Sequence, residues 1–220
     1  MLRLGTVLLL PALLLPRTCT VNLGGGTPDS PGEVKLGVPY VAQQDAYACG
    51  PASILMWALY DGRTNVTQAQ IAQYVGCSTG SGTLLDRLAP GVRAFTDATD
   101  AVLESAGSSL FFARQISSIG SRDPVLSVVN AGTHAGILEG GHWHATDSGL
   151  NVWDYVYFHD PLVAADRRFE AADWTGLVNY HVVSASSAAN GQEGLSTYGS
   201  SVRVRGSDGS IGGPILKEER

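Results

Sequence analysis

The residue best suited to covalent chemistry in this chain is a cysteine at the expected start of a helix. Cys49 stands directly before Gly50-Pro51, and the sequence after Pro51 is a continuous apolar run that ends at Asp61-Gly62. Proline suits the first turn of a helix, where its missing N–H costs nothing. Because the unsatisfied N–H groups at a helix N-terminus favour a thiolate, the pattern predicts a lowered pKa for Cys49 and a nucleophile at neutral pH.

Three further polar residues would complete this chemistry. Gln43, six residues before the cysteine, offers a side-chain amide that would meet an oxyanion together with the backbone N–H of Cys49. His142 follows a Gly-Gly pair on an expected strand and would take the thiol proton and return it to a leaving amine. Asp160, which precedes a proline, would accept a hydrogen bond from the imidazole and fix its orientation.

These residues carry a resemblance to a known family. The order Gln43, Cys49-Gly50-Pro51-Ala52, Gly141-His142 and Asp160-Pro161 resembles the papain-like cysteine peptidases, and most closely cysteine peptidase family 39, the bacteriocin-processing type. The resemblance spans about residues 38–174. It implies an α+β papain-like fold, in which a helical half headed by the cysteine faces an antiparallel β-sheet half that carries the histidine and the aspartate. It also implies a thiol-dependent peptidase that hydrolyses peptide or related amide bonds through a thioester acyl-enzyme.

The choice of His142 has a rival on the same strand. His144 lies two residues further, and residues two apart on a strand point to the same face. Two histidines on one face also allow a metal site, with His159 or Asp160 as the third ligand. No denser ligand motif is present, so the sequence predicts neither a metal nor a cofactor. The other histidines are interpreted as ordinary polar residues: His134, His159 and His181.

The cysteine itself has a structural alternative. The chain has three cysteines, of which Cys19 lies in the expected leader, so that Cys49 and Cys77 are free to form a disulfide in an exported protein. Such a bond would silence the nucleophile. Two other functions also stay open: a catalytically silent peptidase-like binding module, and a cysteine-dependent amidase or acyltransferase acting on cell-wall or peptide substrates. The complete set of four polar residues argues against the silent module.

Composition indicates one globular domain with extended ends. The 220 residues are 44% hydrophobic and 15% charged, with a formal net charge of −6. No basic stripe is present, so nucleic acid is not an expected partner. A peptide or protein substrate, a monomer without an integral membrane domain, and a secreted or cell-envelope location are expected. The predicted organisation is a signal or leader segment, a linker, the peptidase domain and a disordered tail, at residues 1–20, 21–33, 34–184 and 185–220.

Local patterns predict the elements that position the candidate site. A capping box of Thr67 and Gln70 marks the start of a short helix at residues 68–75. Apolar spacing favours a helix from Thr96 to Ser105, and the run from Val125 to Val129 is typical of a buried strand. Further helices are expected after Pro51 and at residues 84–88, and further strands at residues 140–147 and 152–159.

Overall fold

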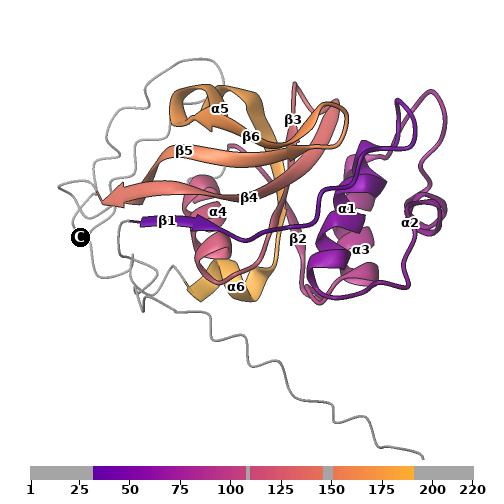
Figure 1. Cartoon of the computed structure of the whole chain (residues 1–220), viewed down its shortest axis with the longest axis horizontal. Helices are drawn as coiled ribbons and strands as arrows, with labels where there is room; N and C mark the ends of the chain where they lie inside the picture. The colour runs from indigo at the N-terminus through magenta and orange to yellow at the C-terminus, as the bar shows by residue number, and fades with distance from the viewer. Residues whose placement is uncertain (1–31, 108–109, 146–150, 191–220) are drawn as a thin grey trace, which may run out of the picture.

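An antiparallel sheet and a group of helices divide the protein into two halves (Figure 1). The computed structural model describes residues 32–107, 110–145 and 151–190. The helical half contains α1 (Cys49–Tyr60), α2 (Gln68–Val75) and α3 (Leu85–Phe95). The other elements are β1 (Gly32–Lys35), β2 (Val102–Ser105), α4 (Phe111–Gly120), β3 (Val125–Val129), β4 (His134–Ala145), β5 (Asn151–Asp160), β6 (Ala164–Glu170), α5 (Ala171–Leu177), β7 (Val178–Val183) and α6 (Ala185–Asn190). This arrangement confirms the predicted α+β class.

The long strand β4 organises the sheet. The strand order is β2-β7-β3-β4-β5-β6, and every pairing among the described strands is antiparallel. The first part of β4 pairs with β3, whereas β1 takes over the same edge between Gly140 and Trp143. The other edge of β4 pairs with β5 along most of its length. One end of β4 therefore lies near the helical half, and its other end lies far from it (Figure 1).

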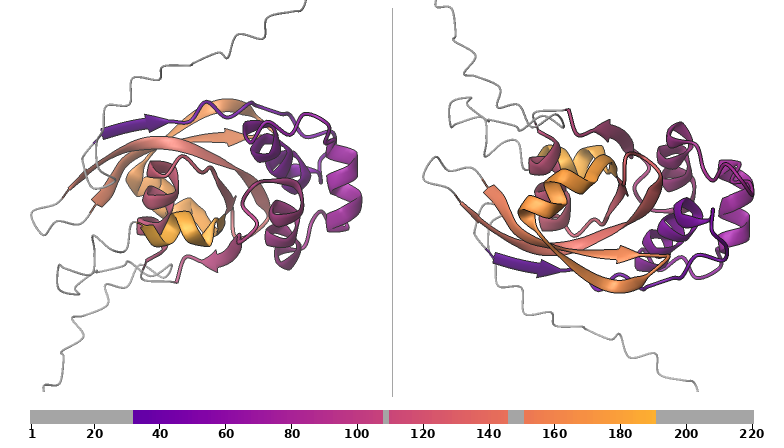
Figure 2. Two further views of the ribbon diagram at one scale, coloured as in Figure 1. Left: turned by 90° about the horizontal axis from the view of Figure 1, so that it is seen from below. Right: turned by 90° about the horizontal axis from the view of Figure 1, so that it is seen from above.

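Strand β3 is covered on both faces of the sheet. Leu126 and Val128 of β3 pack into the core formed with the helical half, and Val125 and Val129 pack into a second core with α4 and α5. Figure 2 shows α4 and α6 against one face of the curved sheet, with α1 to α3 beyond its end. A strand buried on both faces requires apolar residues at successive positions, which explains the unbroken run predicted as β3.

The central helix α1 is buried on all sides. Residues 50–58 are all buried, including the large side chains of Ile54 and Trp57. A helix that is apolar all round has to lie in a core, and α1 packs against α2, α3 and β4. It ends at Asp61-Gly62, where Gly62 takes a left-handed φ of 79°. Its start at Cys49 is therefore held firmly by the packing of the whole helix.

The other local patterns had mixed outcomes. The capping box of Thr67 and Gln70 is present and begins α2, which confirms that prediction. The predicted helix from Thr96 to Ser105 is wrong, because this segment ends in strand β2, which pairs with β7. Helix α6 occupies the start of the predicted tail at residues 185–190. The predicted leader, most of the linker and the rest of the tail lie outside the described residues.

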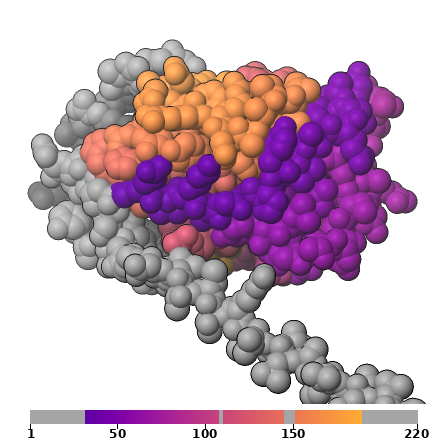
Figure 3. Space-filling view, in the orientation of Figure 1, coloured from indigo at the N-terminus to yellow at the C-terminus, as the bar shows by residue number. Residues whose placement is uncertain are grey.

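The segment that follows β1 connects the two halves. It runs along the sheet and then crosses to the helical half, where it leads into the loop before Cys49 (Figures 1 and 3). Leu36 N donates a hydrogen bond to the Glu139 carbonyl, and Val38 N donates to the Glu139 carboxylate. Among the described helices, none is long and apolar enough to cross a membrane.

Candidate active site

Cys49 is the first residue of α1. Its position is preceded by Ala48, and among the described residues no side chain caps this end of the helix. The first N–H groups of the helix therefore remain available near the thiol, where their partial positive charge stabilises a thiolate. The Cys49 side chain is half-buried and is a free thiol.

His134 is the side chain that the sheet presents to Cys49. It is the first residue of β4 and follows a tight turn in which Asn130, Ala131 and Gly132 all have left-handed φ angles, of 54°, 56° and 86°. The imidazole forms a hydrogen bond with the Cys49 thiol. The turn thus places a histidine at the end of the sheet that faces the helical half.

Asp160 lies behind the histidine at the end of β5. Its Oδ1 is 2.8 Å from Nε2 of His134, which leaves Nδ1 of the ring for the thiol. Oδ1 also accepts a hydrogen bond from Leu162 N at 3.0 Å, as expected for an Asp-Pro turn. Asp160 is only 4% exposed, so this carboxylate is held in one orientation. The three side chains therefore stand in the order that acyl-transfer sites require: a nucleophile, a base and an acid that orients the base.

The electrostatics of the three groups agree with a thiolate and imidazolium pair. Burial raises the pKa of the Cys49 thiol, but hydrogen bonds from His134 and from the backbone of Ala135 and Gly50 outweigh it, so the pKa lies below the usual value. The bond to Cys49 raises the pKa of His134 against the effect of burial, and Asp160 raises it further. Burial raises the pKa of Asp160, but His134 and other donors bring it below its usual value.

The structure does not bring His142 to Cys49, and His134 takes the place that the sequence analysis expected for His142. The reason is the register of the sheet. His142 pairs with Tyr155, eight residues along β4 from His134, which is roughly 27 Å at about 3.4 Å per residue. Its Nδ1 is 2.6 Å from Asp154, and the rival His144 is 2.7 Å from the same carboxylate. Both histidines therefore belong to a surface cluster at the far part of the sheet.

Gln43 lies on the loop before α1, close to the end of β5. Its backbone N–H donates to the Pro161 carbonyl at 2.9 Å, directly after Asp160. Its side-chain Nε2 donates to the Asp45 carbonyl at 2.6 Å, within the same loop. The loop thus places the amide on the Asp160 side of the site, and its role towards an oxyanion stays a prediction.

A cleft of about 300 Å³ lies between the two halves at this site. Cys49 and His134 both line it, one from each half. The helical wall consists mainly of a loop of small residues, and the sheet wall consists of the turn before β4. The lining residues besides these two are Ala46, Tyr47, Gly50, Gly80, Ser81, Gly82, Thr83, Leu85, Leu88, Val128, Gly132, Thr133 and Ala135.

Cys77 is not bonded to Cys49. Both are free thiols in the described part of the chain, and the Cys77 Sγ lies 3.4 Å from the Tyr47 carbonyl. The structure therefore does not contain the alternative Cys49–Cys77 disulfide, and the Cys49 thiol is free to react.

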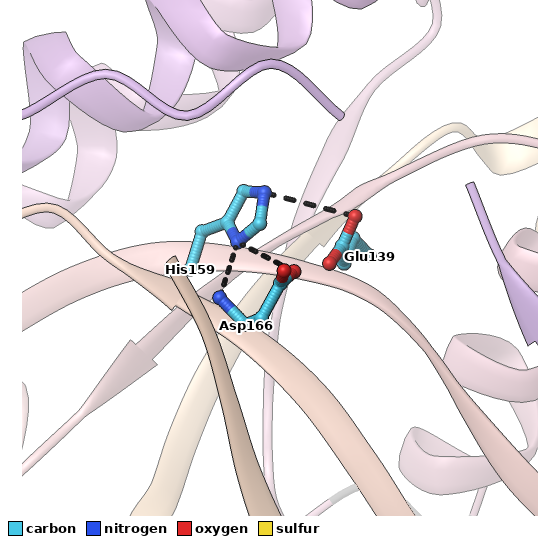
Figure 4. A group of neighbouring side chains, drawn as sticks. All are labelled: Glu139, His159 and Asp166. Atoms are coloured by element: carbon cyan, nitrogen blue, oxygen red, sulfur yellow. Dashed lines mark hydrogen bonds and ion pairs between the residues drawn. The ribbon is translucent and has the colours of Figure 1, made fainter. Parts of the chain in front are cut away.

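A second cluster of polar side chains contains Glu139, His159 and Asp166 (Figure 4). Among the described residues it is the one group of three whose ligand atoms are close enough to share a metal ion. Both nitrogens of His159 are already used by the backbone: Nε2 lies 2.8 Å from the Val38 carbonyl, and Nδ1 accepts from Asp166 N at 3.0 Å. The ammonium of Lys35, 2.9 Å from Asp166, supplies the positive charge. We interpret the cluster as structural, and the third ligands proposed for His142 and His144 lie away from those two residues.

This cluster leads to a prediction about stability. Burial, together with the adjacent Asp166 carboxylate, raises the pKa of Glu139 to about 7. An acid whose pKa is raised on folding loses stability as the pH rises from its unfolded value through its folded value. As the pH rises from 5 to 8, Glu139 is expected to lower the free energy of unfolding by on the order of 2 kcal/mol. The Glu139→Gln variant should not show this decline. Urea unfolding at several pH values measures this difference.

The matched control is the exposed Glu170, whose carboxylate contacts Arg168 on the surface. Glu170→Gln is expected to keep the pH dependence of the unmodified protein. An equal decline of stability with pH in Glu139→Gln and in the unmodified protein would show that Glu139 does not hold a proton in the folded state.

The fold brings Cys49 and His134 to one cleft from its two halves, with Asp160 in contact with the histidine. A family model described as the Peptidase_C39 like family matches residues 35–182, and the chain belongs to this family. This confirms the resemblance found in the sequence. Among solved structures, the chain is similar to the peptidase domain of Streptococcus ComA, a bi-functional ABC transporter involved in a quorum-sensing pathway. The identity is 15% and the TM-score 0.46, and the match covers 66% of this chain and 96% of that chain. No curated protein sequence matches the chain significantly.

Proposed function

We propose that the protein is a thiol-dependent peptidase that hydrolyses peptide or related amide bonds with Cys49 as nucleophile, His134 as general base and acid, and Asp160 as the residue that orients the histidine. The observation that carries this proposal is the hydrogen-bonded series from Cys49 through His134 to Asp160 beside the cleft. Membership of the peptidase family supports it.

The reaction would proceed in two steps. The Cys49 thiolate attacks the substrate carbonyl carbon, and the C–N bond breaks as His134 protonates the leaving amine, which leaves a thioester. His134 then removes a proton from water, the resulting hydroxide attacks the thioester, and the C–S bond breaks to release the acid and the thiolate. The N–H groups at the start of α1, together with the amide of Gln43, would stabilise the oxyanion in both steps.

The proposed pair sets the expected pH dependence. Activity should rise as the pH passes the lowered pKa of Cys49, because the thiolate then forms, and should fall as it passes the raised pKa of His134, because the imidazolium is then lost. A bell-shaped profile of kcat/KM against pH is therefore expected, with its plateau between the two values. A profile with a single rise near the ordinary thiol pKa would show that the two groups do not act as a pair.

The experiment that tests the function is incubation of the protein with a mixed peptide pool in water enriched in ¹⁸O, followed by mass spectrometry. Hydrolysis predicts new C-termini that carry one ¹⁸O atom, and these products should be absent with Cys49→Ala. Products that contain a second acceptor amine and no ¹⁸O would indicate an acyltransferase. The absence of any Cys49-dependent product would favour the silent binding module.

A further inference from the structure

Two side chains hold the carboxylate of Asp160, His134 and Arg167, and Arg167 has no part in the reaction proposed above. Oδ1 contacts His134, whereas Oδ2 accepts a hydrogen bond of 2.5 Å from Nη1 of Arg167. Asp160 is 4% exposed, so its negative charge lies away from water. A buried carboxylate is costly unless it is paired and hydrogen-bonded, and a charge-assisted bond of this length is a strong one.

Arg167 is itself held in place by the sheet and by an aromatic ring. It lies on β6 and pairs with Phe158 of β5, two residues before Asp160. Its guanidinium lies 4.8 Å from the ring centre of Phe169, and this ring packs against Phe158 and Trp174. Stacking on an aromatic face restricts the planar guanidinium, so its N–H groups keep one direction towards Asp160.

We propose that Arg167 acts on the active-site histidine through Asp160: its guanidinium balances the charge of this carboxylate and so limits how tightly His134 holds its proton. The effect expected on catalysis rests on the proposed function. The structural part of the inference is the series of contacts from Arg167 on β6 through Asp160 to the His134 imidazole.

The charges of the site explain why such a residue is needed. Two titratable groups face His134: Cys49 from α1 and Asp160 from β5. With the thiolate and the imidazolium formed, these three groups carry one net negative charge, and Arg167 brings the total to zero. Without the guanidinium, the unbalanced Asp160 would hold the proton on His134 more tightly, and the imidazolium would give it up less readily to the leaving amine.

The test is an NMR titration of the histidine Cε1–H signals in the Cys49→Ala background, so that the thiol does not contribute. The His134 signal is assigned by its loss in His134→Gln. The compared variants are Arg167→Gln, which removes the charge, and Arg167→Lys, which keeps it. Arg168→Gln is the matched control, because Arg168 lies next in the strand but stacks on Tyr155, 3.7 Å from its ring centre.

We expect Arg167→Gln to raise the His134 pKa by about half a pH unit, with Arg167→Lys and Arg168→Gln within about 0.2 unit of the parent. In the protein with an intact thiol, Arg167→Gln should lower kcat/KM about two- to threefold and move the alkaline limb of the pH profile upwards by about half a pH unit. An unchanged or lowered His134 pKa in Arg167→Gln would overturn the inference, because loose packing alone would weaken the contact with Asp160 and lower this pKa.

The titration does not depend on catalysis, so the inference and the proposed function fail separately. If Arg167→Gln raises the His134 pKa but the protein has no peptidase activity, the inference about Arg167 holds and the proposed function is rejected. If the protein is a peptidase but Arg167→Gln does not raise this pKa, the proposed function holds and the inference is rejected. If Arg167→Gln does not fold, Arg167→Lys decides: a folded variant within 0.2 unit of the parent supports charge balance, and a larger shift contradicts it.

Discussion

Replacing Cys49 with alanine should abolish peptide hydrolysis, with a loss of at least four orders of magnitude in kcat/KM. The thiolate is the only group in the proposed reaction that forms a covalent bond to the substrate, so nothing else in the site substitutes for it. The fold should be unchanged, because alanine is a strong helix former and the position is the first residue of α1. Peptide turnover and thermal unfolding measure the two effects.

Cys77→Ala is the matched control for this variant, since its thiol is also half-buried and contacts only the Tyr47 carbonyl by hydrogen bond among the described residues. It is expected to retain most of the activity. Residual turnover above one per cent in Cys49→Ala would contradict a thioester intermediate at this residue.

Replacing His134 with alanine should lower kcat/KM by about three orders of magnitude, whereas His142→Ala should stay within about threefold of the unmodified protein. A general base and acid contributes about 10² to 10⁴ to such reactions, and loss of the imidazolium also removes the group that stabilises the thiolate. His142 contacts Asp154 and stacks on Tyr155, far along β4 from the cleft. Steady-state kinetics with any peptide identified as a substrate measures the two losses.

His144→Ala provides the control for the surface cluster, because His144 shares the Asp154 carboxylate with His142. Its effect should be as small as that of His142→Ala. A severe loss in His142→Ala together with a mild one in His134→Ala would restore the assignment drawn from the Gly-His motif and contradict the geometry described above.

The elements predicted well from the sequence are those that local chemistry determines. The helix behind Cys49 follows from a long apolar run with a proline in its first turn, and α2 follows from the capping box at Thr67. The run from Val125 to Val129 forms β3 with its predicted bounds, because a strand covered on both faces has to be apolar throughout. These signals lie within a few residues of the structure they produce.

The position of the histidine depended on sheet register, which a motif of adjacent residues does not contain. The strands β4 and β5 form a hairpin, and antiparallel pairing puts Ile137 opposite His159 and His142 opposite Tyr155. A histidine that reaches Asp160 therefore has to lie near the start of β4. The strands expected at residues 140–147 and 152–159 would have indicated this, because counting outwards from the middle of the gap between them puts the partner of Asp160 before residue 140.

The error at residues 96–105 has a similar origin. Ala98 and Ala101 are buried at a spacing that is typical of a helix, and this spacing suggested one. The segment instead ends as β2, whose Val102 pairs with Val183 of β7, more than 75 residues later. Long-range pairing overrides local spacing in short segments, since the strand gains its hydrogen bonds from a distant part of the chain.

The most direct test of the account is the rate at which iodoacetamide alkylates Cys49 between pH 5 and pH 9, followed by mass spectrometry with Cys77 as internal reference. The thiolate and imidazolium pair predicts that Cys49 stays reactive to a lower pH than Cys77, that His134→Ala moves the midpoint of the Cys49 rate profile upwards, and that His142→Ala leaves it unchanged. A Cys49 profile that coincides with that of Cys77, or one that is unaffected by His134→Ala, would contradict the account.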